Sequence, residues 1–252
     1  MERIKESKSL CTMIQTPHDV ALLVNERGFL PFFESDIPHF SLEEETPMEL
    51  WFPDDNTMGV WDWKSDIILE ADCAYGKFFK SKACFVSMEV FPHLVNYRRA
   101  LHVLSADEER VLRVIREHKS LLSGELKKLC GYVTARSPRE SNPLVRAYNK
   151  ENDITPKPAK QRNARPSFDS LITHLQMSGH VLIAAFEYKT DRKGRTYGWG
   201  VARYCTPEDF FGDDRIAVDC TPEESLRVLR MFLKKHFPGI TQSQMTSVLE
   251  YR

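Results

Sequence analysis

The pattern that most constrains the fold of this chain is a series of three helix signals followed by two β-type runs, in the second half of the sequence. The first signal is the capping box Ser105-Ala-Asp-Glu108, in which each side chain satisfies a backbone N–H at the start of a helix. Apolar residues then recur at helical spacing over 111–115. Ser123 predicts a second, short helix, and residues 168–175 predict a third that ends at Gly179.

The two β-type runs cover residues 181–188 and 197–204, and a polar turn over 190–195 separates them. Such a pair predicts a β-hairpin. Three helices followed by a hairpin with a basic tip is the order of a winged helix, which is a relative of the helix-turn-helix. We therefore expect an α+β, mostly helical fold with a winged helix-turn-helix. A capping box at Thr221 begins a further helical segment, which resembles the start of a second helix-turn-helix that the chain does not finish.

Three segments follow from this reading. Residues 1–102 are expected to form an N-terminal α+β region with an aromatic cluster, residues 103–211 a winged-helix domain, and residues 212–252 a C-terminal helical segment. A basic insertion at 132–166 is unusually long for a connection inside a compact domain. The first segment is expected to contain helices over 17–27, 48–52, 66–75 and 91–99 and a short strand over 84–86.

Composition is that of a globular protein, because 42% of the 252 residues are hydrophobic and 28% are charged. No apolar signal segment follows the first Met and no run is long enough to cross a bilayer, so we expect a cytoplasmic protein without a membrane partner. The six cysteines form no CxxC pair and the histidines show no metal-binding spacing. We therefore expect reduced thiols, no metal and no cofactor.

Positive charge gathers in one part of the chain although the net charge is −1. Residues 127–165 contain ten Lys and Arg against three Asp and Glu, an excess of seven. Such a segment suits a partner rich in phosphates, and double-stranded DNA is the expected partner; a solvated loop is the alternative. The candidate DNA-binding residues are Arg136, Arg139, Lys160, Arg162 and Arg165 in the insertion and Arg192, Lys193 and Arg195 at the hairpin tip.

The third helix is expected to expose a row of polar side chains. None of them is an Arg or Asn placed for a bidentate contact with a base, so sequence-specific reading is not expected. The row consists of Ser167, Asp169, Ser170, Thr173, His174 and Gln176.

A second candidate site combines aromatic rings with carboxylates in the first segment. A pocket for a flipped base uses aromatic rings for stacking and a carboxylate to activate water or to stabilise a cationic sugar. Asp62 and Asp66 are the candidate catalytic residues, and Trp61, Trp63 and Tyr75 are the candidate stacking residues. Rings at this density also commonly fill a protein core, and that interpretation stays open.

Residues 74–89 carry a family resemblance, together with Pro92 and the pair Tyr97-Arg98. An aromatic pair, then Ala83-Cys-Phe85-Val-Ser87, then a Pro and a Tyr-Arg resemble the AlkZ/YcaQ-like family of winged-helix DNA glycosylases. The resemblance extends from about residue 17 to residue 211. It implies tandem winged helices and excision of alkylated or crosslinked bases from DNA, without a metal or an organic cofactor.

The chain departs from this family at its polar signature. The family carries Gln-apolar-Gln or Gln-apolar-Asp after its first helix, whereas Pro31 and Phe33 occupy those places here, and Ser81 stands where the family has a His. Neither Pro nor Phe can position a water molecule. The family chemistry is therefore lost or supplied by other carboxylates. A non-catalytic DNA-binding regulator or damage-site binder and a protein-interacting winged helix are the alternatives.

Overall fold

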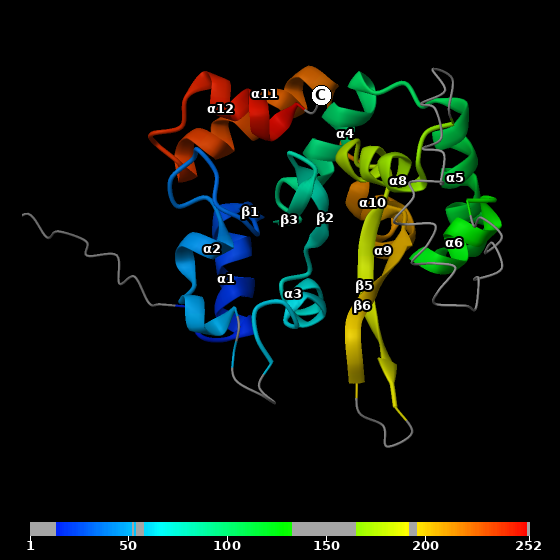
Figure 1. Cartoon of the computed structure of the whole chain (residues 1–252). Helices are drawn as coiled ribbons and strands as arrows, with labels where there is room; N and C mark the ends of the chain where they lie inside the picture. The colour runs from blue at the N-terminus through cyan, green and yellow to red at the C-terminus, as the bar shows by residue number, and fades with distance from the viewer. Residues whose placement is uncertain (1–13, 52, 54–57, 133–164, 192–195, 251–252) are drawn as a thin grey trace, which may run out of the picture.

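Figure 1 shows the computed structural model, which describes residues 14–51, 53, 58–132, 165–191 and 196–250. Within these residues the fold is α+β, with helices packed around two three-stranded antiparallel sheets. No helix in the described ranges has the length and apolar character that crossing a bilayer requires.

The helices begin at clear capping signals, several of which are reciprocal capping boxes. The side chains of Thr16, Ser105 and Thr221 each accept a hydrogen bond from the backbone N–H three residues later. The carboxylate of that later residue in turn accepts a hydrogen bond from the backbone N–H of the capping residue. The elements in chain order are α1 (Pro17–Arg27), β1 (Phe29–Pro31), α2 (Leu42–Glu45), the 3-10 helix η1 (Met48–Leu50), α3 (Lys64–Glu70), β2 (Ala74–Phe79), β3 (Lys82–Val86), α4 (Phe91–Leu101), α5 (Ala106–His118), β4 (Ser120–Leu122), α6 (Ser123–Leu129), α8 (Phe168–Met177), β5 (Leu182–Thr190), β6 (Thr196–Cys205), α9 (Pro207–Phe211), α10 (Asp213–Ile216), α11 (Pro222–His236) and α12 (Gln242–Leu249).

The first sheet has the strand order β1-β3-β2. Its register places Leu30 opposite Phe85 and Tyr75 on the other side of Phe85. The expected helix over 66–75 is wrong in its second half, because α3 ends at Glu70 and β2 begins at Ala74. β2 is buried along nearly its whole length, so its sequence lacks the alternation of polar and apolar residues that marks a half-exposed strand.

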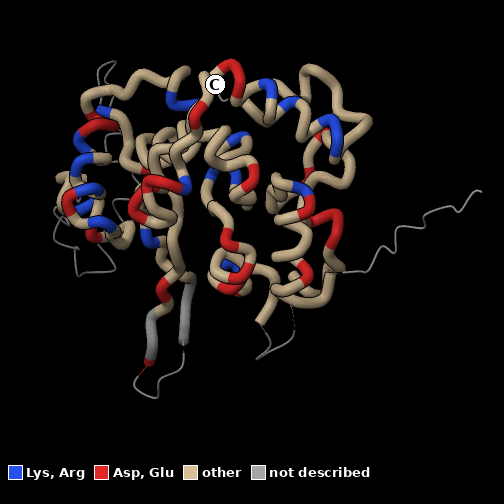
Figure 2. Tube along the Cα trace, turned by 180° about the vertical axis from the view of Figure 1, so that it is seen from behind, with Lys and Arg blue, Asp and Glu red and all other residues tan. Residues whose placement is uncertain are grey.

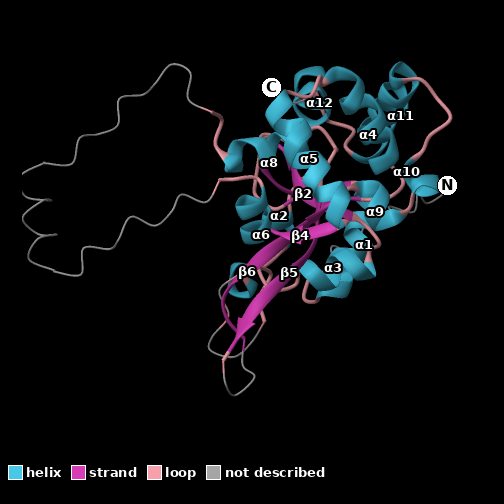
Figure 3. Cartoon of the chain, turned by 90° about the vertical axis from the view of Figure 1, so that its right-hand side faces the viewer, coloured by secondary structure: helices cyan, strands magenta, loops and turns pink. Residues whose placement is uncertain are grey.

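The second sheet has the strand order β4-β6-β5, and β5 and β6 form the predicted hairpin. The short strand β4, which the sequence did not predict, joins α5 to α6 and pairs with the end of β6. In Figures 1 and 3 the hairpin projects past the helices at one end of the molecule.

Two hydrophobic clusters form the core of the described residues. The first joins the N-terminal segment to α5, α6 and α8, and the second joins the first sheet and α4 to α11 and α12. Both clusters cross boundaries of the three expected segments, so the segments pack against each other through apolar contacts. The division at 102 and 211 stays a prediction.

The third helix of the expected series, α8, lies against β2. Gln176 is fully buried and its side-chain oxygen accepts a hydrogen bond from the backbone N–H of Lys77 at 3.0 Å. Thr173 is buried as well, and its hydroxyl accepts a hydrogen bond from the Lys77 ammonium at 3.1 Å. Gly76 makes this approach possible, because a Cβ there would lie 3.2 Å from the Gln176 oxygen. The expectation that Thr173 and Gln176 are exposed is therefore wrong, since β2 covers that face of the helix.

Arg98 is the most deeply buried charged side chain among the described residues, with 1% of its surface exposed. Its guanidinium donates to the carbonyl of Met177 at 2.8 Å and to that of Phe78 at 2.9 Å. It also donates to the carbonyls of Val248 and Leu249 at 2.7 and 3.0 Å. One side chain on α4 therefore links the C-terminal ends of β2, α8 and α12.

We predict that Arg98→Lys lowers the free energy of unfolding by at least about 3 kcal/mol, because buried carbonyls left without a donor each cost about 1–3 kcal/mol. A lysine ammonium presents its donors at one point and does not reach carbonyls on three elements. Urea unfolding followed by circular dichroism measures the loss. The matched control is Arg227→Lys, an exposed residue on α11 that should change stability by less than about 0.5 kcal/mol. Equal effects of the two substitutions would show that Arg98 does not have this role.

A second prediction concerns His180, which is 8% exposed and whose Nδ1 lies 2.9 Å from the hydroxyl of Ser178. Burial, helped by the charge of Arg99, lowers the pKa of His180 to about 4. As the pH falls below the ordinary histidine pKa of about 6.5, His180 becomes protonated in the unfolded chain but stays neutral in the folded chain. The contribution of His180 should therefore lower the free energy of unfolding by about 2–3 kcal/mol between pH 7 and pH 4.5.

Urea unfolding of the wild type and of His180→Gln at both pH values tests this. The difference in unfolding free energy between the two proteins should shrink by that amount as the pH falls. A difference that stays constant with pH would contradict the assignment.

Candidate nucleic-acid-binding surface

The aromatic and carboxylate residues singled out in the sequence lie beside the β5–β6 hairpin. α3 lies alongside this hairpin (Figure 1), and the backbone N–H of Phe186 donates to the Ser65 hydroxyl at 3.3 Å. The end of β1 brings Phe33 to the same place, where its ring lies 5.7 Å from that of Trp61. We call this region the α3–hairpin surface, formed by Phe33, Trp61, Asp62, Lys64, Asp66, Lys82, Phe186 and Tyr188.

A tight turn before α3 presents Trp61 and Asp62. The Asp62 N–H donates to the carbonyl of Gly59 at 2.8 Å, and the Asp62 carboxylate accepts from the Gly59 N–H at 3.2 Å. Gly59 is required there, because a Cβ would lie 2.7 Å from the carbonyl oxygen of Leu50. Asp62 is therefore held by its own turn.

The three candidate stacking residues have different environments. Trp63 and Tyr75 are only 5% and 4% exposed and belong to the core, and the Trp63 indole donates to the Met58 carbonyl at 3.1 Å. Trp61 is partly exposed and packs on the rings of Phe32 and Trp51, with centroids at 5.7 and 5.4 Å. Trp61 is therefore the only one of the three whose ring reaches the surface.

Lys64, the first residue of α3, extends between two aromatic rings. Its ammonium lies 5.2 Å from the centroid of Trp61 and 4.6 Å from that of Phe186. Burial lowers the pKa of Lys64, and the nearby charge of Asp62 acts in the opposite direction. A second lysine, Lys82 at the start of β3, is exposed and lies over the ring of Phe33 at 5.7 Å.

The two candidate catalytic carboxylates flank the hairpin. Asp62 is partly exposed and Asp66 is exposed. Burial, followed by the charges of Asp62 and Asp66, raises the pKa of Tyr188 on β5, so both carboxylates act electrostatically on this residue. Gly200 on the paired strand leaves room for the ring, because a Cβ there would lie 2.9 Å from it.

Sequence reasoning did not include Phe33, Lys82, Phe186 or Tyr188 in the site. Phe186 and Tyr188 are two residues apart on one strand and therefore point to the same face, which was a detectable signal. Phe33 and Lys82 come to the site through strand pairing between β1 and β3, for which no local pattern exists.

The expected basic residues fall largely outside the described residues. Arg165 is described and exposed, and its guanidinium stacks on the ring of Tyr132 at 3.8 Å while donating to the Cys130 carbonyl at 3.1 Å. Over α5 and α6, Lys and Arg are interspersed with Asp and Glu (Figure 2). The candidates outside the described residues are Arg136, Arg139, Lys160, Arg162, Arg192, Lys193 and Arg195.

The cysteines of the described residues carry free thiols, four of them buried and Cys220 partly exposed, while Cys11 lies outside the described residues. Burial raises the pKa of Cys84 and of Cys205 to about 12, so these thiols stay protonated. Among the described residues, no three His, Cys, Asp or Glu side chains are grouped so as to hold a metal ion.

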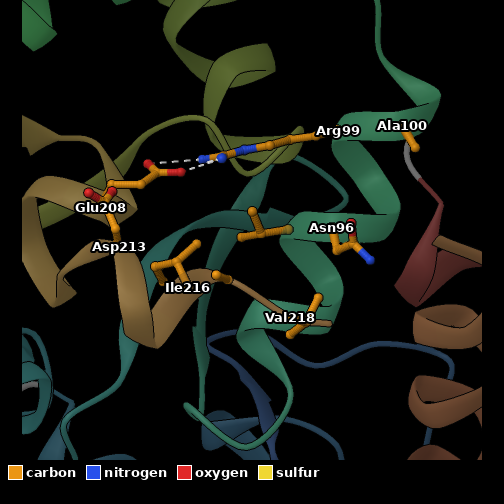
Figure 4. Close-up of a pocket in the computed structure, with 9 residues that line it drawn as sticks. Asn96, Arg99, Ala100, Glu208, Asp213, Ile216 and Val218 are labelled. Atoms are coloured by element: carbon orange, nitrogen blue, oxygen red, sulfur yellow. Dashed lines mark hydrogen bonds and ion pairs between the residues drawn. The ribbon is translucent and has the colours of Figure 1, made fainter. Parts of the chain in front are cut away.

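A separate cavity of about 470 Å³ lies between α4 and α10, away from the α3–hairpin surface (Figure 4). Arg99 points across it to Glu208, with which it forms an ion pair, and also donates to the Gly179 carbonyl at 2.8 Å. Burial opposes ionisation of Glu208, but the hydrogen bond and charge of Arg99 hold its pKa below the ordinary value. The charged groups of this cavity therefore serve to hold α9 against α4.

The model of the AlkZ related family matches residues 14–250 of the chain. The chain therefore belongs to the AlkZ-related family, which relates it to the DNA-glycosylase-like repair proteins that its sequence resembles. No curated protein and no solved structure matches the chain. The positions of the missing polar signature lie at the end of β1, where Pro31 pairs with Cys84 and Phe33 contacts Trp61. Of the positions at which the chain departs from the family resemblance, Phe33 lies on the α3–hairpin surface, whereas Pro31 is buried and Ser81 contacts Met177.

We predict that Trp63→Ala lowers the free energy of unfolding by about 3–5 kcal/mol, because it leaves a cavity in the core. Trp61→Ala should cost less than about 2 kcal/mol, because this ring already faces solvent on one side. Urea unfolding measures both values. Equal losses would place Trp61 in the core and remove it from the surface.

Proposed function

We propose that this chain is a DNA-binding protein of the glycosylase-like type and that it binds duplex DNA with the α3–hairpin surface. The observation that carries the proposal is the partly exposed pair Phe33 and Trp61, flanked by Lys64 and Lys82 and by the carboxylate of Asp62. Aromatic faces stack on unpaired bases, and adjacent cations attract the phosphate backbone.

We also propose that the segment from Ser105 to Cys205 is a winged helix. The order α5-β4-α6-α8-β5-β6 and the sheet order β4-β6-β5 support this assignment. In a winged helix the third helix commonly enters the major groove. Here β2 covers the face of α8 that carries Thr173 and Gln176. The exposed face carries Asp169 and His174 and no Lys or Arg, so we assign the DNA contact to the hairpin and α3. The candidate cations of the tip, Arg192, Lys193 and Arg195, continue this hairpin in the sequence.

A catalytic step would use the carboxylates of the same surface. With Trp61 stacked on an extruded base, Asp62 accepts a proton from water as the water oxygen forms a bond to the sugar C1′. The bond between C1′ and the base nitrogen breaks, and the base leaves with the electron pair. Asp66, in the first turn of α3, stabilises the cationic sugar. Tyr75 supports Trp61 from the core through Phe32, whose ring lies 5.8 Å from that of Tyr75 and 5.7 Å from that of Trp61.

A non-catalytic damage-site binder is the second candidate, and two observations favour it. Pro31 and Phe33 provide no side chain that positions water, and the Asp62 carboxylate already accepts a hydrogen bond from Gly59. In this function the rings recognise a distorted or unpaired base without excising it.

We predict that the protein binds an alkylated duplex more tightly than an undamaged duplex, and that raising salt from about 50 to 200 mM weakens binding at least about tenfold through counterion release. Fluorescence anisotropy with labelled duplexes measures both. Trp61→Ala should remove the preference for the alkylated duplex, because it removes the stacking face. Leu69→Ala, an exposed apolar residue on the same helix, is the matched control.

Base release separates the two functions. An enzyme releases the alkylated base, and Asp62→Asn slows that release while leaving duplex binding intact. A binder shows the preference without release. Absence of binding at low salt would overturn the proposal.

A further inference from the structure

We propose that Lys64 is an amine nucleophile that forms an imine with the C1′ aldehyde of an abasic deoxyribose in DNA. The inference rests on the proposed function, because the sugar must reach the α3–hairpin surface. It adds a covalent activity and names its substrate class as the aldehyde that remains where a base has been lost.

The geometry holds the amine at the place where a base would stack. The Lys64 nitrogen lies 5.2 Å from the centroid of Trp61 and 4.6 Å from that of Phe186, so rings on two different elements confine it. Lys64 forms no ion pair with any residue in the described part of the chain. A sugar whose missing base leaves the Trp61 face empty would present its C1′ to this nitrogen.

The environment favours the reactive form of the amine. Addition to an aldehyde requires a neutral nitrogen with a free electron pair, whereas an exposed lysine is almost entirely protonated at neutral pH. Burial lowers the pKa of Lys64 and so raises the neutral fraction.

No neighbouring lysine that the structure describes combines contacts to two aromatic rings with a pKa lowered by burial. Lys77 donates its ammonium to the Thr173 hydroxyl at 3.1 Å and lies beneath α8. Lys82 is exposed and contacts a single ring, that of Phe33. Lys80 is paired with Asp36 at 2.8 Å.

The reaction balances without a cofactor. The Lys64 electron pair forms a bond to the aldehyde carbon, and the carbonyl π electrons move to oxygen. The oxygen then leaves as water with the two protons that the amine loses, which produces a carbon–nitrogen double bond. Asp62 is the adjacent carboxylate that can carry a proton between nitrogen and oxygen.

Reductive trapping tests the proposal with the full chain. The protein is mixed with a labelled duplex that contains one abasic site, and cyanoborohydride reduces any imine to a stable secondary amine. We expect a covalent protein–DNA band on a denaturing gel. Mass spectrometry of the digested adduct should locate the modification at Lys64.

Lys64→Arg is the decisive variant, because its guanidinium stays protonated and offers no neutral amine. With each reaction normalised to the amount of abasic duplex bound, the substitution should reduce the trapped fraction at least about tenfold. Lys234→Arg, an exposed residue on α11, is the control and should trap like the wild type.

Trapping that persists in Lys64→Arg, or an adduct that maps to Lys82 or to the N-terminal amine, overturns the assignment. Binding of the abasic duplex by the wild type without a trapped product also overturns it while leaving the proposed DNA binding intact. Absence of duplex binding removes both proposals together.

Discussion

The buried guanidinium of Arg98 is the interaction on which the arrangement of this fold depends. It donates to carbonyls at the ends of β2, α8 and α12, three elements that lie far apart in the sequence. Removing a guanidinium from water costs several kcal/mol, and the hydrogen bonds to these carbonyls offset that cost only when all the elements are in place. The neighbouring Arg99 extends the connection to Gly179 and Glu208. The Tyr-Arg pair that carries part of the family resemblance therefore acts from inside the core.

This core decides which surface remains for a partner. Because α8 is held between Arg98 and β2, its polar side chains Thr173 and Gln176 are used inside the protein. The β5–β6 hairpin projects past the helices at one end of the molecule (Figures 1 and 3). The same packing sets α3 beside the hairpin, so Trp61, Lys64 and Phe186 come together.

The candidate site was predictable in part. Trp61, Asp62 and Asp66 are adjacent in the sequence, so their density identified the region, and the structure places both carboxylates near Tyr188. The sequence did not distinguish Trp61 from Trp63, because adjacent aromatic residues look alike until their neighbours are known. It also did not identify Phe33, whose contact with Trp61 arises from the pairing of β1 with β3.

The sequence by itself determined where most helices begin and where the hairpin turns, because capping boxes and turns act between residues three or four positions apart. It also determined membership of the AlkZ-related family, since the motifs lie in continuous runs. Only the tertiary structure decided that β1 and β4 form as paired strands, that Gln176 is buried and that Trp61 is partly exposed. Those features depend on contacts between residues that are distant in the chain, and local periodicity carries no information about such partners.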